Sequence, residues 1–278
     1  MTVLTRNMPS FNGVAANSTA TLDLPLGLTY KGIMLQRGGT TFTNAHISEV
    51  RVKGNGRLLY TVSGADLAIQ NQFDGLSNPS GNFTYIDFER PKLKTKAATE
   101  LTAIGTGSPL NSDPNSPLFN PTPLTTLQME IDIGGATAPT LASTAYQIGP
   151  RPLGVLKKRR RFYFTASGAG DLEIATLPKG DVIDKIWFIP TGNHINSVRL
   201  ERDNFIVFER SKALNDQYQN EFGVRTPQGN NFVIDPSEQG FGNNTIVSNV
   251  NDFRLVISVS AATTLTTYVD YLGGLSGN

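Results

Sequence analysis

Two histidines, His46 and His194, are the side chains of this sequence best suited to proton transfer near neutral pH. Each begins a similar stretch, His-Ile-x-x-Val-Arg, and neither has a serine or aspartate signature that recurs beside both. A catalytic histidine is rarely needed twice at matching positions, so we interpret both as structural residues at strand starts. A metal site of the cupin type needs a clustered His-x-His with a carboxylate, which neither histidine offers.

Glu130 and Asp132 are the best-spaced pair of carboxylates. They lie on the polar side of the alternating segment 127–133, so a strand would hold them on one face about 7 Å apart. Such a pair could bind Ca²⁺ or act as an acid and a base. Carboxylates in this setting more often face solvent or pair across a sheet, and we favour that interpretation.

The run Lys157, Lys158, Arg159, Arg160 and Arg161 is the only dense cluster of charge. One hypothesis is that it contacts anionic lipid headgroups or a genome, with each basic residue contributing about 1 kcal/mol near a charged surface. The alternative is a solvated strand entry or an ion-pair cluster between subunits. The sequence leaves both open.

The composition excludes several classes of site. The 278 residues include no cysteine, which excludes disulfides, thiolate catalysis and cysteine-ligated metals. No apolar run approaches the roughly 18–20 residues of a membrane helix, and the first residues do not predict a secretory signal. The net charge of +1 argues against a chain that coats nucleic acid.

These residues sit in a pattern typical of β-strands. Apolar and polar residues alternate in segments 20–24, 127–133, 171–174 and 254–260, which predicts strands with one buried face. More continuous apolar runs at 183–189 and 205–208 predict strands buried on both faces. Trp187 falls in the first of these runs, so we expect it in the core rather than on a binding platform.

Two segments predict short helices instead. Ser63 is a good N-cap, and Ala65, Ala68, Ile69 and Phe73 follow it at helical spacing. After Ser211, the residues Leu214, Tyr218 and Phe222 recur every four positions. We expect these apolar residues to form the buried faces of the two helices.

An internal repeat organises the chain. Segment 24–27 is echoed at 177–180, segment 46–52 at 194–200, and the turn 54–56 at 202–204, at offsets between 148 and 153 residues. The helix starts at Ala65 and Ala213 keep the offset of 148. We therefore predict an all-β protein of two tandem eight-stranded jelly rolls, each with one short helix, over residues 1–150 and 151–278. The Pro- and Gly-containing segment 149–154 would link them.

The order of short motifs resembles the double jelly-roll major capsid proteins of tailless, membrane-containing bacteriophages, the corticovirus type most of all. The matching segments are 12–16, 24–30, 50–52, 56–59, 67–69, 88–91, 130–133, 173–178 and 271–273. Residues 107–124 carry five prolines and form a longer loop than that family has, which we expect at the surface of the first jelly roll.

The resemblance implies a structural protein without catalytic or cofactor-binding residues. It implies homotrimers of pseudo-hexameric outline that tile an icosahedral virion capsid over an internal membrane. Implied partners are neighbouring capsomers, penton or spike proteins, membrane proteins and the lipid itself, without sequence-specific binding of nucleic acid. The resemblance implies synthesis in the host cytoplasm and allows structural Ca²⁺, with unknown ligands. The alternatives are a carbohydrate-binding β-sandwich or viral spike, and a double jelly-roll amidase acting on glycans.

Overall fold

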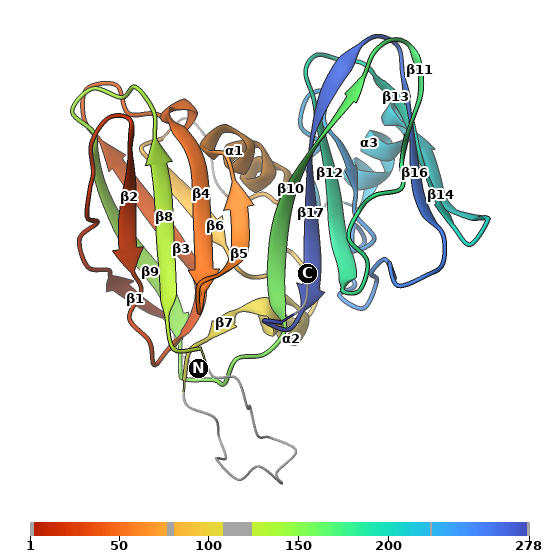
Figure 1. Cartoon of the computed structure of the whole chain (residues 1–278). Helices are drawn as coiled ribbons and strands as arrows, with labels where there is room; N and C mark the ends of the chain where they lie inside the picture. The colour runs from red at the N-terminus through yellow and green to blue at the C-terminus, as the bar shows by residue number, and fades with distance from the viewer. Residues whose placement is uncertain (1–2, 77–80, 108–123, 223, 277–278) are drawn as a thin grey trace, which may run out of the picture.

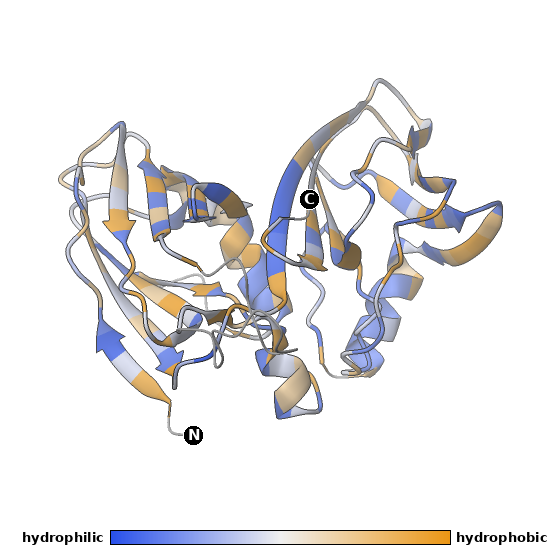
Figure 2. Ribbon diagram, turned by 60° about the horizontal axis from the view of Figure 1, so that its bottom comes forward, coloured by the Kyte–Doolittle hydropathy of each residue, from blue (hydrophilic) through white to orange (hydrophobic). Residues whose placement is uncertain are grey.

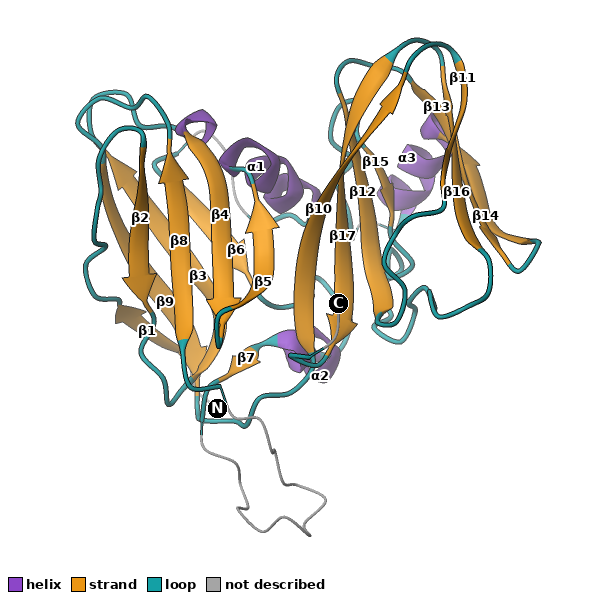
Figure 3. Cartoon of the chain, viewed as in Figure 1, coloured by secondary structure: helices purple, strands orange, loops and turns teal. Residues whose placement is uncertain are grey.

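The computed structural model describes residues 3–76, 81–107, 124–222 and 224–276. Strands make up most of it, with a few short helices between them (Figure 3). The greater part of the predicted surface loop, residues 108–123, lies outside the described residues.

The first half of the chain forms two antiparallel sheets that face each other (Figure 1). The sheet orders are β1-β9-β3-β6, with β7 also paired to β3, and β2-β8-β4-β5. The elements are β1 (Leu4–Asn7), β2 (Ser18–Asp23), β3 (Thr29–Gly38), β4 (Ile47–Gly54), β5 (Arg57–Val62), α1 (Gly64–Phe73), β6 (Phe83–Asp87), α2 (Lys96–Thr99), β7 (Ile104–Gly105), β8 (Leu127–Ile133) and β9 (Thr140–Ile148), with 3₁₀ turns at Asn44–His46 and Glu100–Thr102.

The second half repeats this plan. Its sheets have the orders β10-β17-β12-β15 and β11-β16-β13-β14. The elements are β10 (Leu156–Ala166), β11 (Gly170–Ile174), β12 (Val182–Pro190), β13 (Ile195–Arg202), β14 (Phe205–Ser211), α3 (Lys212–Glu221), β15 (Phe232–Ile234), β16 (Phe253–Val259) and β17 (Thr263–Gly273). The chain is thus the predicted all-β double jelly roll. The first half adds the two-residue β7 and the four-residue α2 to that plan.

The duplication extends to irregularities in the strands. Register shifts occur at Val52/Lys53 between β4 and β5, and 148 residues later at Leu200/Glu201 between β13 and β14. Two further register shifts, in β3 and β4, are matched in β12 and β13. Because a bulge re-aims every later side chain of its strand, matched bulges keep equivalent residues on equivalent faces.

Two-residue hairpin turns are also duplicated. Asn55 and Gly56 have φ of 49° and 74°, and Asp203 and Asn204 have φ of 48° and 68°. Positive φ at both turn positions is typical of a type I′ turn, which suits the twist of the flanking strands and favours Asn, Asp and Gly. The predicted correspondence between the turns 54–56 and 202–204 is therefore a shared backbone conformation.

The alternating strands bury the faces that the sequence predicted. In β8, Leu127, Met129, Ile131 and Ile133 are buried between the sheets, while the polar residues between them are partly exposed. Full burial of one such side chain contributes about 1.5–3 kcal/mol. The core of the first half also includes Trp187 and Tyr268 from the second, so apolar packing continues across the junction.

Both helices begin where the sequence predicted, because Ser63 and Ser211 cap them through their hydroxyl groups. The predicted face of the first helix is partly wrong. Ala68 and Phe73 are buried as expected, but Ala65 is exposed, and Leu67 is buried in its place. Polar residues account for the rest of the buried face, because α1 lies against charged groups of the second half.

Candidate interaction surfaces

The two halves meet where β5 and α1 of the first lie beside β10 of the second (Figure 1). Arg159 of β10 is at the centre of this junction. Its guanidinium donates two hydrogen bonds to Asp270 of β17, at 2.6 and 2.7 Å, and one to the Tyr60 hydroxyl at 2.7 Å. It also donates to the Gln70 side chain. Since Tyr60 and Gln70 belong to the first half, one buried cation ties both halves together.

A second buried group of charges lies beside it. Lys185 of β12 is 2.7 Å from Asp74, at the end of α1, and Arg225 is 3.2 Å from the same carboxylate. Arg225 also donates to Asp235 at 2.5 Å. Burial opposes ionisation of Asp235, but Arg225 and then Lys185 outweigh it and lower its pKa to about 2. The Asp235 carboxyl group is therefore ionised at neutral pH.

For two other carboxyl groups at the junction, burial outweighs the nearby lysines and raises the pKa. Asp87 ends β6, and Glu89 follows two residues later, with Lys157 at 3.5 Å from Asp87 and Lys31 at 3.4 Å from Glu89. Burial, and then the charge of Asp87, raises the pKa of Glu89 to about 7. Burial likewise raises the pKa of Asp87. The junction thus contains a carboxyl group that titrates near neutral pH.

The basic run 157–161 lies along β10 and pairs largely within the chain. Lys158 and Arg159 are buried, and Lys157 is nearly so. Lys158 pairs with Asp181, and Arg161 donates to Glu49 at 2.7 Å. Arg160 donates to the carbonyl oxygen of Leu59 at 3.4 Å. In this conformation the charges of Lys158 and Arg159 are directed at carboxylates of the same chain, so contact of the run with lipid or another subunit stays a prediction.

Both histidines lie immediately before strands. His46 ends a 3₁₀ turn before β4, and its Nδ1 lies 2.9 Å from the Thr43 hydroxyl. His194 precedes β13, and its carbonyl oxygen accepts a hydrogen bond from the Ser260 amide at 2.8 Å. These contacts are local contributions to strand ends.

Glu130 and Asp132 do share one face of β8, and cations of β4 occupy that face. Arg51 donates to Glu130 at 2.9 Å and to Asp132 at 2.5 and 2.8 Å, while Lys53 lies 2.5 Å from Glu130. Hydrogen bonds from Lys53 and Arg51 lower the pKa of Glu130, and those from Arg51 lower the pKa of Asp132. The two carboxylates are consequently ion-paired across the sheet, and their oxygens are not arranged around an empty ion site.

The far side of the second half carries apolar side chains that the described residues leave exposed. Leu214 and Tyr218 of α3 and Phe222, which directly follows the helix, are 46%, 43% and 37% exposed, so the predicted buried face of this helix is wrong. Asn215 and Gln219 face inward instead, and both donate to the carbonyl oxygen of Val233 at 2.9 Å. The predicted buried strand 205–208 is also wrong, because the first three of its residues are exposed on β14. Figure 2 shows hydrophobic stretches of ribbon at the outer edge of the second half.

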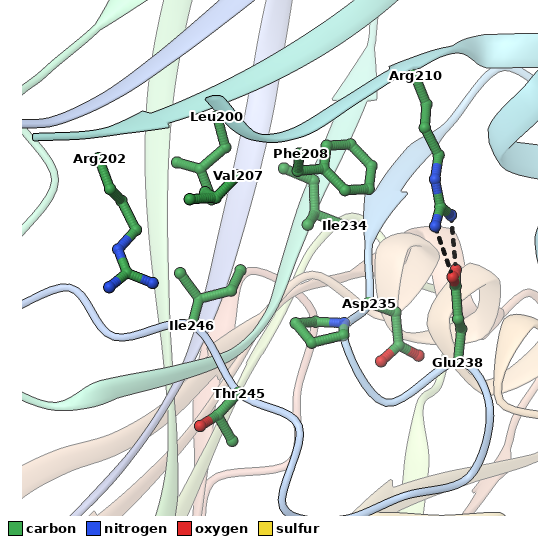
Figure 4. Close-up of a pocket in the computed structure, with 11 residues that line it drawn as sticks. Leu200, Arg202, Val207, Phe208, Arg210, Ile234, Asp235, Glu238, Thr245 and Ile246 are labelled. Carbon is green, nitrogen blue, oxygen red and sulfur yellow. Dashed lines mark hydrogen bonds and ion pairs between the residues drawn. The ribbon is translucent and has the colours of Figure 1, made fainter. Parts of the chain in front are cut away.

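A pocket of about 260 Å³ opens beside β14 (Figure 4). Val207 and Phe208 line it from β14, and Asp235 lines it from the end of β15. Arg210 closes one end through a two-pronged pair with Glu238, at 2.8 and 2.9 Å. No sequence pattern predicts this pocket, because its lining comes from four separate segments.

Within the described ranges, no group of three or more His, Cys, Asp or Glu side chains is placed to hold a metal ion. Nor does that part of the chain contain a helix long and apolar enough to cross a membrane.

Known proteins are similar to this chain over nearly its whole length. The model of the viral coat protein P2 N-terminal domain matches residues 5–148, and that of the C-terminal domain matches residues 156–275. The major capsid protein P2 of Pseudoalteromonas phage PM2 is 27% identical over 98% of this chain and 97% of its own. The crystal structure of major capsid protein P2 from bacteriophage PM2 matches with a TM-score of 0.82 and 25% identity, covering both chains completely. An atomic structure of Sulfolobus turreted icosahedral virus matches at 0.70 and 13% identity, over 99% of this chain and 91% of that chain, and shows the fold alone.

Proposed function

Because the chain belongs to the viral coat protein P2 family, we propose that it is the major structural protein of a viral capsid and acts by assembly rather than by catalysis. The observation that carries this proposal is the match of a coat-protein domain model to each half, over nearly all of a chain that is 27% identical to a major capsid protein. The double jelly-roll fold supports the same conclusion.

We further propose that three copies form one capsomer. Each chain supplies two halves of the same topology, so a ring of three would present six similar edges to its neighbours. Closed symmetry covers the contacts between copies without open-ended growth. Such capsomers would tile an icosahedral shell over an internal membrane, with penton, spike and membrane proteins as further partners, after synthesis in the host cytoplasm.

The experiment is the native mass of the purified full chain, measured with CaCl₂ and with EGTA. A species of about 90 kDa, three times the chain mass of 30.0 kDa, supports the trimer. Persistence in EGTA would show that the trimer does not need Ca²⁺, and loss in EGTA would assign the ion a structural role. A species of about 30 kDa under both conditions would overturn the trimer.

The contact with the membrane is tested with vesicles. The assembled protein is sedimented with vesicles that contain phosphatidylglycerol and with neutral phosphatidylcholine vesicles. Arg160→Gln is the variant of choice within the run, because Lys158 and Arg159 are buried in ion pairs and their substitution would disturb the fold. Binding to the anionic vesicles that weakens in the variant supports the proposed lipid contact. Equal binding of both proteins to both vesicles would contradict it.

A further inference from the structure

The segments from β4 to β6 and from β13 to β15 correspond residue by residue at an offset of 148. Asn71 donates to the carbonyl oxygen of Tyr85 at 2.7 Å, and Gln219, 148 residues later, donates to that of Val233, also 148 residues later. The capping serines, Ser63 and Ser211, keep the same separation. A surface residue of α1 or β5 therefore has a defined counterpart on α3 or β14.

The α1 face that meets the second half is polar. Asp66 accepts a hydrogen bond from the Tyr268 hydroxyl at 2.6 Å, Gln70 accepts from Arg159, and Asp74 pairs with Lys185. All three donors come from the sheet β10-β17-β12-β15 of the second half. This face is thus the part of the first half against which the next jelly roll is docked.

The counterparts of these three residues, 148 positions later, are Leu214, Tyr218 and Phe222. They are the exposed apolar residues of α3. The position that is a docking face in the first half is therefore an uncovered face in the second, and its chemistry has changed from polar to apolar. Burial of exposed leucine and aromatic side chains is favourable in water, which makes this face suited to a protein partner.

The pocket beside β14 leads to the same face independently. Its lining residues Val207, Phe208 and Asp235 are the counterparts of Leu59, Tyr60 and Asp87. In the first half each of those three lies against β10. The Leu59 carbonyl is 3.4 Å from Arg160, the Tyr60 hydroxyl 2.7 Å from Arg159, and Asp87 3.5 Å from Lys157. No described segment lies against the counterpart site beside β14 as β10 lies against β5 and α1, so that site is open.

The strand that corresponds to β10 is β1. Each is the first strand of its half and the edge of the equivalent sheet, and the strand pairing places Thr5 of β1 at the position of Arg159. All four residues of β1 are exposed. Beside it, Tyr85 and Tyr146 form an edge-to-face pair on the outer side of the sheet, with ring centroids 5.8 Å apart. Figure 1 shows β1 and β14 at opposite ends of the molecule.

We propose that the β14–α3 face of one copy binds β1 and the adjoining outer sheet face of the next copy. This contact would repeat between chains the one that β5 and α1 make with β10 inside the chain. It is head-to-tail, so it uses two different surfaces of each copy and closes into a ring when the rotation allows. The inference rests on the proposed self-assembly and identifies the surface that performs it.

The first test replaces the apolar face with charge. The double variant Leu214→Glu/Tyr218→Glu should convert a 90 kDa species to one of about 30 kDa, with an unchanged circular dichroism spectrum. Leu101→Glu is the control, because Leu101 is 47% exposed and Leu214 46%. Leu101 belongs to the 3₁₀ turn Glu100–Thr102 directly after α2, and Figure 1 shows α2 away from both β1 and β14. The control should keep the mass of the wild type. A double variant that stays at 90 kDa would overturn the assignment.

The second test does not require that a substitution weaken the contact between copies. The chain has no cysteine, so Thr5→Cys and Tyr218→Cys introduce the only thiols. Because the equivalent residues inside the chain, Arg159 and Gln70, meet through the ends of long side chains, a short bismaleimide is used to bridge the two thiols. It should give covalent trimers with the double variant and none with either single variant. A 90 kDa wild type whose double variant fails to cross-link would reject this face but keep the trimer. A wild type of 30 kDa whose double variant also fails to cross-link would reject both proposals.

Discussion

Arg159→Met is expected to be among the most destabilising single substitutions at the junction between the halves. It keeps most of the side-chain volume but removes the guanidinium that pairs with Asp270 at 2.6 Å. Asp270 is only 1% exposed, and burial opposes its ionisation, while Arg159 outweighs that effect and lowers its pKa. Without Arg159, a buried carboxylate loses its main partner, and the Tyr60 hydroxyl and the Gln70 side chain lose a donor.

The expected loss follows from the burial of the pair. Removing one partner of a buried ion pair lowers the free energy of unfolding by about 3–5 kcal/mol. That is a large part of the roughly 5–15 kcal/mol that stabilises an ordinary domain. Because most of the loss comes from the charge left behind, Arg159→Met/Asp270→Asn should recover at least half of it. The Asn side chain can still accept the hydrogen bond that Trp187 Nε1 gives Asp270 at 3.3 Å.

The assay is urea unfolding followed by tryptophan fluorescence. Trp187 is the only tryptophan, and it lies at the junction, with its ring 4.9 Å from that of Phe73 in the first half. Its emission therefore reports separation of the two halves. Arg254→Met is the control, because Arg254 pairs with Asp252 at the surface. The urea midpoint of this variant should match that of the wild type, since surface ion pairs contribute little stability. A loss below about 1 kcal/mol in Arg159→Met, or a double variant less stable than the single one, would refute the reasoning.

Two further predictions concern pH and helix capping. The pKa of Glu89 is about 7 in the folded chain and 4.5 for an ordinary glutamate, so the folded state binds the proton more tightly and wild-type stability should fall as the pH rises from about 4.5 to 7. Glu89→Gln should flatten this slope in urea midpoints at pH 5 and pH 8, and an unchanged slope would contradict the assignment. Ser63→Ala and Ser211→Ala should each lower the free energy of unfolding by about 1 kcal/mol in thermal denaturation, because each removes a hydroxyl that caps a helix. Ser→Thr at either position should restore most of the loss, and an alanine variant as stable as the wild type would show that the cap contributes nothing.

The sequence predicted those parts of the fold that depend on local patterns. Alternation between residues 127 and 133 located β8 and its buried face, since period-two patterning is a direct consequence of strand geometry. The serine caps located both helices. The repeat at an offset of 148 indicated the duplicated topology, and the matched bulges of β4–β5 and β13–β14 confirm it in detail.

The errors share one physical cause. Periodicity shows that apolar residues lie on one face, but it does not show whether that face meets the core or a second molecule. Leu214, Tyr218 and Phe222 do form a stripe on α3, and the stripe points away from the core. The buried ion pairs were also beyond the sequence, because Arg159 and Asp270 are 111 residues apart and only the fold brings them together.

The short segment 149–155 between β9 and β10 makes the contact between the two halves of a chain different from the proposed contact between copies. A tether of seven residues holds the two jelly rolls of one chain at a high effective concentration, so their contact forms without loss of the translational freedom of a second molecule. Such a contact tolerates polar groups such as Asp66 and Gln70. Their desolvation weakens the contact, but their hydrogen bonds fix how the two jelly rolls align. Two separate chains have no tether, and dilution opposes their association. The tethered α1 face can therefore be polar, whereas the corresponding α3 face, which has no tether to its proposed partner, is apolar.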